Sequence, residues 1–230
     1  MPAILDAPPL RPDATAAPAV TVADILEQFG DVPLYRIVMD PAPGTATEAD
    51  IDRVKRETGR LCELIDGTLI EKAVGAESDL MGSKLIALLL PFVEARGLGW
   101  VLGGQGFLRL SGSRLRSADV AFVRYEQVEG DRFPSTPAYP ALYPDLAIEI
   151  LSPGNTAREM RTKRADCFTA GTRLVWEIDP AAETATVYTG VDQVAEELGA
   201  DGTLGGRDVL PGFSVPLRDV LNAVRKTPRA

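Results

Sequence analysis

The residues that decide the fold are 146–151, which have the sequence LAIEIL. Such an aliphatic run is typical of a strand that is buried on both faces of a sheet. Because side chains alternate along a strand, Glu149 shares its face with the apolar residues Ala147 and Leu151. An unpaired carboxylate in this position costs several kcal/mol, and it takes up a proton unless a cation lies beside it. Glu149 is therefore a candidate site residue.

A second carboxylate breaks the same rule in residues 118–123, which read ADVAFV. Asp119 would share its face with Ala121 and Val123. Two acids on apolar strands are explained if they converge on one cation, and Mg²⁺ takes carboxylate oxygens, backbone carbonyls and water. The strands alone support equally well the alternative that one or both acids lie at a strand end in solvent, or pair with an arginine.

The neighbouring segments predict an α/β fold with a central mixed β-sheet flanked by helices. Capping residues, apolar periodicity and Asp-Gly or glycine turns indicate the boundaries. The expected helices are 21–28, 47–58, 78–96, 156–170 and 217–224, and the expected strands are 61–65, 68–74, two around a glycine turn within 100–110, 118–125, 146–151, 173–178 and 184–188. Residues 20–230 are expected to form one domain, and the Pro- and Ala-rich residues 1–19 a disordered tail.

The chain contains no histidine, which excludes several classes of chemistry. Ser-His-Asp and Cys-His catalysis, HExxH metal sites and nucleases with an imidazole base all need that side chain. Cys62 and Cys167 lie far apart without a CxxC partner, so neither a zinc site nor a disulfide is expected. Acid–base or metal chemistry must come from carboxylates, lysine, tyrosine or bound water.

The formal net charge of −9 opposes nucleic-acid binding, because duplex affinity comes largely from neutralised phosphates. Positive charge does gather on the helix expected after Glu149, at Arg158, Arg161, Lys163 and Arg164. These side chains could simply lie on a solvent-exposed face of the helix without a role in function, and this interpretation is preferred for Arg158 and Arg161. The N-terminus does not resemble a secretory signal, and the longest apolar stretch, 85–93, is too short to span a bilayer. We therefore expect a cytoplasmic protein with no membrane contact.

Four motifs in order along the chain resemble the Uma-type endonucleases of the PD-(D/E)XK, or restriction endonuclease-like, superfamily. They are ELIDG at 63–67, RSADVAFV at 116–123, PDLAIEILSP at 144–153 and LVWEIDP at 174–180. The resemblance extends over about residues 20–220. It implies a restriction endonuclease-like fold, in which a mixed four- or five-stranded sheet lies between helices and the acids stand on adjacent strands.

The resemblance also implies roles for individual residues. Asp119 matches the first acid, Glu149 the second, and Glu63 a further acid. The superfamily's lysine normally stands two residues after the second acid, where this chain has Leu151. In the Uma-type pattern a lysine on the following helix takes its place, which is Lys163 here. The chain departs from the pattern twice more: the usual proline before the first acid and a common histidine at the start of the long helix are replaced by Ala118 and Ser78.

The leading hypothesis is a metal-dependent nuclease that hydrolyses phosphodiester bonds in nucleic acid, with DNA as the expected substrate. Asp119, Glu149 and the carbonyl of Ile150 would hold Mg²⁺ or Mn²⁺, and Glu63 would contribute directly or through water. Lys163 would orient or deprotonate the attacking water, or stabilise charge on the phosphorane. The weaker candidates for phosphate contacts are Arg116 and Arg161. The resemblance further implies a possible homodimer, since related nucleases often need two sites to cut two strands.

Two other hypotheses remain. The chain could be a catalytically inactive binding or regulatory module on the same scaffold, as suggested by its acidic charge, by Leu151 and by the lack of a nucleic-acid-reading element. Alternatively, Asp119 and Glu149 could be structural partners of Arg116 or Arg164 in buried ion pairs, which add little net stability.

Overall fold

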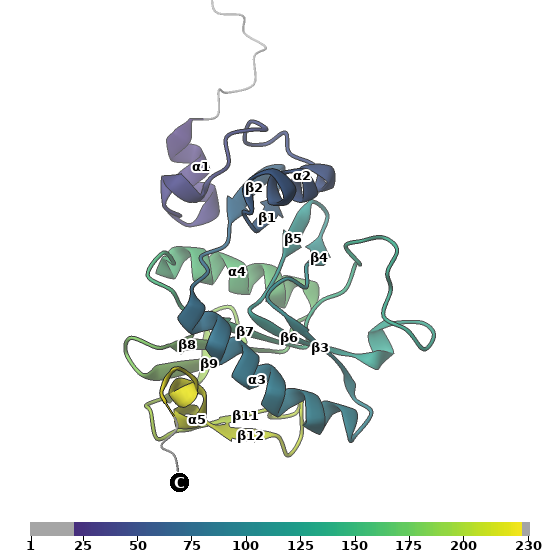
Figure 1. Ribbon diagram of the computed structural model, residues 1–230, viewed down its shortest axis with the longest axis vertical. Helices are drawn as coiled ribbons and strands as arrows, with labels where there is room; N and C mark the ends of the chain where they lie inside the picture. Colours follow the sequence, from purple (N-terminus) through teal and green to yellow (C-terminus); the bar gives the residue numbers. More distant parts are fainter. Residues whose placement is uncertain (1–20, 227–230) are drawn as a thin grey trace, which may run out of the picture.

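Helices pack on both faces of a mixed β-sheet in the computed structural model, which describes residues 21–226 (Figure 1). The predicted α/β class, with a central mixed sheet flanked by helices, is confirmed. The tail predicted for residues 1–19 lies outside the described residues, and the single domain expected over residues 20–230 stays a prediction.

The order of the elements follows the expected one closely. The helices are α1 (Val22–Phe29), α2 (Glu48–Thr58), α3 (Ala76–Glu94), α4 (Ala157–Ala170) and α5 (Leu217–Leu221). The strands are β1 (Cys62–Ile65), β2 (Thr68–Glu71), β3 (Gly99–Gly103), β4 (Leu108–Ser111), β5 (Arg114–Arg116), β6 (Val120–Arg124), β7 (Leu146–Ile150), β8 (Leu174–Asp179), β9 (Thr184–Gly190), β10 (Gln193–Leu198), β11 (Thr203–Gly205) and β12 (Ser214–Pro216). The short strands β5, β10, β11 and β12 were not individually predicted.

A six-stranded sheet with the order β10-β9-β8-β7-β6-β3 forms the centre of the molecule, so the four or five strands implied by the resemblance were too few. Strand β7 runs parallel to β8 and antiparallel to β6, so the sheet is mixed. All five residues of β7 are buried, as the LAIEIL run predicts. The register between β6 and β7 pairs Val120 with Ile148 and Ala121 with Ala147.

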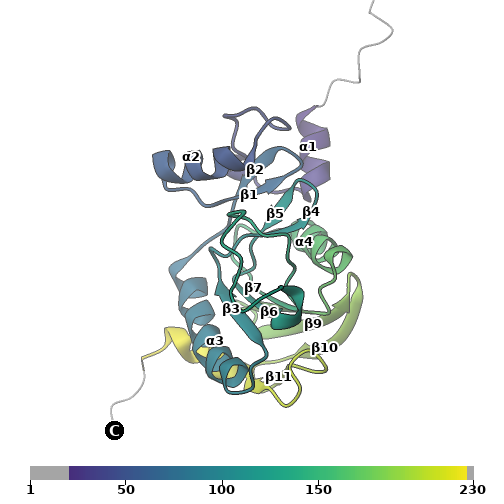
Figure 2. The ribbon, with the colours of Figure 1, turned by 90° about the vertical axis from the view of Figure 1, so that its right-hand side faces the viewer.

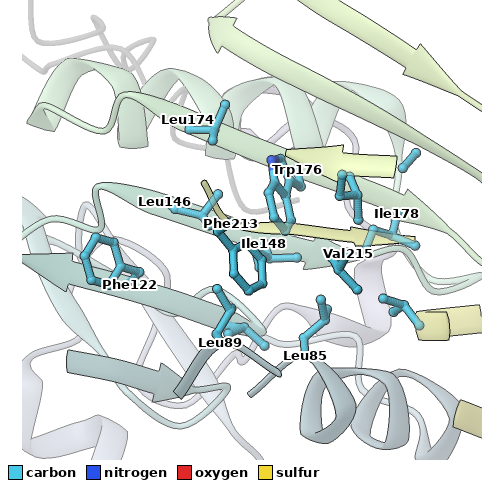
Figure 3. Packing of buried hydrophobic residues seen from close by; sticks show 14 of the residues in the cluster. Leu85, Leu89, Phe122, Leu146, Ile148, Leu174, Trp176, Ile178, Phe213 and Val215 are labelled. Atoms are coloured by element: carbon cyan, nitrogen blue, oxygen red, sulfur yellow. The ribbon is translucent and has the colours of Figure 1, made fainter. Parts of the chain in front are cut away.

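The two faces of this sheet are covered by different helices. On one face α3 packs with α5, β11 and β12 around a core that includes Leu85, Ile148, Trp176 and Phe213 (Figure 3). On the other face α4 covers small side chains such as Ala147. Because side chains alternate along β7, Glu149 lies on the α4 face, with Ala147.

A second, four-stranded sheet with the order β2-β1-β5-β4 lies with α1 and α2 at one end of the larger sheet (Figure 2). Its β1–β2 hairpin turns at Asp66 and Gly67, which have φ angles of 49° and 75°. Two central residues with positive φ are typical of the type I′ turn, so the predicted Asp-Gly hairpin is confirmed. The segment 104–107 joins β3 to β4 and crosses from one sheet to the other.

The helix starts follow the capping signals in the sequence. Thr21, Thr47 and Thr156 each form a capping box at the first turn of α1, α2 and α4. Gly30, which ends α1 with a φ of 78°, lies so close to α4 that a Cβ atom there would stand 2.5 Å from the Glu159 nitrogen. No helix within residues 21–226 has the length and apolar character that crossing a bilayer requires.

The packing of α3 on the sheet predicts a large loss of stability when its core side chain is shortened. Leu85 is fully buried, whereas Leu80 on the same helix is about half exposed. We expect Leu85→Ala to lower the free energy of unfolding in urea by about 2–5 kcal/mol, and Leu80→Ala to change it by less than about 1 kcal/mol. Equal effects of the two substitutions would contradict this packing.

Candidate active site: a buried carboxylate–lysine network

Asp119 and Glu149 are neighbours on adjacent chain segments. Asp119 lies one residue before β6, not within the strand as expected, and its side chain is 19% exposed. If the β6–β7 register continues by one residue, Asp119 stands opposite Glu149 on the α4 face. The Asp119 Oδ2 atom accepts a hydrogen bond of 2.8 Å from the backbone nitrogen of Ile150, which fixes this carboxylate against the end of β7.

Lys163 reaches the same place from α4. Its ammonium nitrogen lies 2.8 Å from Glu149 Oε2, 3.2 Å from Glu63 Oε1 and 3.0 Å from the carbonyl oxygen of Ser117. The Lys163 side chain is only 8% exposed. The structure therefore brings Glu63, Glu149 and Lys163 together, although Glu63 is far from the other two in the sequence.

Glu63 has a hydrogen-bond donor at each of its oxygens. Its Oε2 atom accepts from Arg116 at 2.8 Å, and its Oε1 atom accepts from the backbone nitrogen of Ser117 at 3.0 Å. Arg116 is buried and also binds Asp166 through Nε and Nη2, at 2.9 and 2.6 Å. Glu63 and Arg116 thus hold Lys163 and the start of β6 in place. Arg116 does not face the solvent, from which a phosphate would approach.

A second buried lysine, Lys72, was missed in the sequence. Its Nζ atom lies 2.8 Å from the carbonyl oxygen of Ser117, 3.2 Å from that of Gly104 and 3.4 Å from Asp119 Oδ1. A signal for it exists: Lys72 follows β2 directly and continues the face of Thr68 and Ile70, which are both buried. It is thus a charged residue on an apolar strand face, as Glu149 is.

The charges of the network perturb one another strongly. Burial raises the pKa of Glu149 to about 7; Lys163 opposes the rise and Asp119 adds to it. Its Oε1 atom is buried and has no hydrogen-bond partner in the described part of the chain. Burial would lower the pKa of Lys163, but Glu149 and Glu63 raise it overall, so this side chain stays protonated at neutral pH. It can supply positive charge, whereas accepting a proton is disfavoured.

A cavity of about 770 Å³ opens beside Asp119. Its walls are the end of β2, the first turns of α3 and the glycine-rich segment 103–106, and both Asp119 and Lys72 line it. Glu149, Glu63 and Lys163 lie behind this wall and do not line the cavity. Asp119 and Lys72 are therefore the members of the network that a molecule in the cavity meets first.

The remaining basic residues of α4 are engaged elsewhere. Arg161, one of the two predicted phosphate contacts, is exposed and holds Asp192 through two hydrogen bonds of 2.8 and 2.5 Å. Arg164 pairs with Glu177 at 2.5 Å. Neither arginine lines the cavity. The hypothesis that Asp119 or Glu149 pairs with Arg116 or Arg164 also fails in its particulars, because the partners of these two acids are Lys72 and Lys163.

The residues at this site fit a divalent ion with few protein ligands. Among residues 21–226 no three acidic or cysteine side chains are grouped as a ready metal site, since Lys163 stands between Glu63 and Glu149. Mg²⁺, however, usually binds through one or two carboxylates and keeps several waters. Glu149 has an oxygen without a partner and Asp119 is partly exposed. The N–H and C=O groups of one strand residue point to the same edge, so the Ile150 carbonyl is directed toward Asp119.

The mixed sheet between helices, with two acids and a lysine at the end of its central strands, defines the restriction endonuclease-like class. A family model described as "Uma2: Putative restriction endonuclease" matches residues 49–218, and the chain belongs to this family. The resemblance seen in the four sequence motifs is thereby confirmed. The family description supports a nuclease as the general function.

A crystal structure described as "a putative nuclease belonging to DUF820" from Anabaena variabilis is similar to this chain. The match has a TM-score of 0.63 and 19% sequence identity, and it covers 75% of this chain and 97% of that one. At this identity the match supports the fold alone. A search of curated proteins finds no match.

The network predicts a specific dependence of stability on pH. Although burial opposes it, Lys163 and Arg116 lower the pKa of Glu63 below its usual value. The stabilisation by Glu63 is thus present above the pKa of the unfolded chain, about 4.3, and is lost as pH falls below it. We expect the free energy of unfolding of the natural protein to decrease between about pH 5 and pH 3 more steeply than that of Glu63→Gln.

At pH 7 the Glu63→Gln protein should be less stable by on the order of 3 kcal/mol, because a buried pair is broken. Glu126→Gln is the matched control, since Glu126 is exposed and has no ion-pair partner within residues 21–226. Denaturant unfolding at a series of pH values measures both effects. Parallel pH curves for the natural protein and Glu63→Gln would show that Glu63 is not held ionised by the network.

Proposed function

We propose that the protein is a nuclease that hydrolyses phosphodiester bonds in nucleic acid, with DNA as substrate and Mg²⁺ or Mn²⁺ as the required ion. The observation that carries this proposal is the position of Asp119 beside Glu149 at the end of β7, with Lys163 joined to Glu149. Family membership supports nuclease activity in general. The ion and the DNA substrate go beyond the family description.

Asp119, Glu149 and the carbonyl of Ile150 are the groups that would hold the ion. When bound, such an ion polarises a phosphate oxygen and lowers the pKa of a water molecule. The bond between Asp119 and the Ile150 nitrogen keeps one carboxylate oriented before any ligand arrives. Burial raises the pKa of Glu149, so its carboxyl group is harder to ionise. A nearby positive charge favours the ionised form that a metal ion needs.

Lys163 supplies part of that positive charge. It donates to Glu149 and stays protonated, so its role is to stabilise negative charge and orient the carboxylate, not to remove a proton from water. Glu63 and Arg116 act through Lys163 and through the start of β6, and are positioning residues. Arg161 could contact a phosphate only after leaving Asp192.

One observation favours the alternative of a catalytically inactive binding or regulatory module. Without a metal ion, Glu149 already pairs with Lys163, and Glu63 pairs with Lys163 and Arg116. Calorimetric titration with Mn²⁺ separates the two functions, because a nuclease of the proposed type must bind the ion at millimolar concentration or below. Absence of binding would favour the inactive module.

The homodimer implied by the resemblance remains a proposal. Cutting both strands of a duplex at one place requires two sites, which a dimer would supply. Light scattering coupled to size-exclusion chromatography measures the mass in solution, and a monomeric mass with and without DNA would remove this proposal.

Substitution of the accessible acid tests the proposed activity directly. We expect Asp119→Asn to reduce cleavage of plasmid and single-stranded DNA by at least about 100-fold, because it removes a charged ligand from the ion. The control is Asp219→Asn, which changes an exposed aspartate on α5, an element that contributes no residue to the carboxylate–lysine network. It should leave the rate unchanged.

Gel assays with Mg²⁺, with Mn²⁺ and with EDTA give the rates. Cleavage by the natural protein that persists in EDTA would contradict the metal requirement. Equal rates for Asp119→Asn and the natural protein would remove Asp119 from the active site.

A further inference from the structure

The cavity beside Asp119 has the charged and apolar groups needed to bind one nucleotide unit. Lys72 and Asp119 provide a positive and a negative group on its wall, while Leu61, Val74 and Ile86 provide apolar surface. Lysine is a common phosphate ligand, and apolar side chains can contact a sugar or a base. Lys163, which the resemblance presents as the active-site lysine, does not line this cavity.

The size of the cavity limits what can enter. Its volume of about 770 Å³ lies within the range typical of small-ligand pockets. A DNA duplex cannot be enclosed in a space of this size, because its two strands are wound around each other with the bases inside. One or two nucleotides of a single strand have a volume that such a cavity can hold.

The charge of the protein also disfavours a duplex. Duplex affinity depends on many lysines and arginines that neutralise phosphates along the backbone. The chain has a net charge of −9, and most arginines within residues 21–226 are paired with its own carboxylates. Around the cavity, Asp79 would repel additional phosphates, whereas Glu71 is paired with Arg60 at 3.1 Å. Lys72 is thus the position in the cavity where a single phosphate is favoured.

The glycine-rich segment 103–106 leaves open space beside the ammonium group of Lys72, whose side chain is otherwise 5% exposed. Gly104 accepts a hydrogen bond from Lys72 through its carbonyl oxygen, and a Cβ atom at Gly104 would stand 3.7 Å from the lysine nitrogen and from the Cα atom of Asp119. A larger side chain would fill the space in front of both residues. The backbone here therefore keeps open the approach to Lys72 and Asp119.

We propose that this cavity binds a single-stranded segment of DNA and that Lys72 contacts its phosphate next to Asp119. The inference rests on the proposed nuclease function and adds to it the substrate class and the lysine that meets the substrate. A duplex would be engaged only where a strand end or an unpaired region can leave the helix.

Binding can be measured separately from cleavage when Ca²⁺ replaces Mg²⁺. Fluorescence anisotropy would compare a labelled single-stranded oligonucleotide with the blunt duplex of the same sequence. We expect the natural protein to bind the single strand at least about tenfold more tightly, and Lys72→Met to weaken that binding by about tenfold, the effect of losing one charged hydrogen bond. The control is Lys84→Met, because Lys84 is exposed on α3 and does not line the cavity.

A second pair of variants tests the cavity without changing any residue of the carboxylate–lysine network. Ser83 is exposed on α3 and lines the cavity, whereas Ala87 is exposed one turn later and does not. Ser83→Trp should fill the cavity and reduce single-strand binding by about tenfold or more, and Ala87→Trp should leave it unchanged. This pair decides the question even if Lys72→Met does not fold.

The outcomes separate this inference from the proposed function. Equal binding of duplex and single strand, or unchanged single-strand binding in Ser83→Trp, would overturn the inference even if the natural protein cleaves DNA. If single-strand binding follows the expected pattern but no cleavage occurs with Mg²⁺ or Mn²⁺, the cavity assignment holds and the nuclease proposal fails.

Discussion

The ammonium group of Lys163 is the interaction on which the site depends. It crosses from α4 to the sheet and contacts Glu149 on β7, Glu63 on β1 and the carbonyl of Ser117 before β6. Three chain segments that belong to two different sheets are thereby joined at one nitrogen atom. Without this cation two buried carboxylates would face each other in a region of low dielectric constant, which costs several kcal/mol.

The charges around Lys163 do not cancel completely. Five carboxylates, those of Glu63, Asp66, Asp119, Glu149 and Asp166, are joined to four cations, Lys72, Arg114, Arg116 and Lys163. Glu149 carries the imbalance: its pKa is raised by burial, and one of its oxygens has no partner among residues 21–226. A region that has one more carboxylate than cations, and an accessible acid at its edge, is suited to a positive ligand. Electrostatics therefore supports the metal proposal, as family membership does.

Local rules predicted most of the fold and part of the site. The hairpin at Asp66-Gly67, the helix caps and the buried strand β7 each depend on a few consecutive residues, and all were correctly expected. The alternation rule also identified Glu149. The same rule would have identified Lys72, which falls within the strand expected at 68–74. Only the tertiary contacts with Gly104, Ser117 and Asp119 show that its ammonium group is enclosed.

The sequence was less informative where burial depends on distant partners. Arg116 was a weaker candidate for a phosphate contact, whereas its environment is set by Glu63 and Asp166, each about 50 residues away in the chain. The short strands β5 and β10 were missed because neither has a continuous apolar run, and their stability comes from pairing with neighbours.

The carbonyl oxygen of Ser117 accepts from both Lys72 and Lys163. Two like charges thus share one acceptor, and the position of each depends on the other. A ligand that draws Lys72 toward the cavity would leave Lys163 as the main donor to this oxygen. The hydrogen bond from Lys163 would then be stronger, and its position beside the buried acids would be more stable. The two lysines behave as one coupled unit, and the free-energy changes measured for replacing each of them singly will not sum to that of the double replacement.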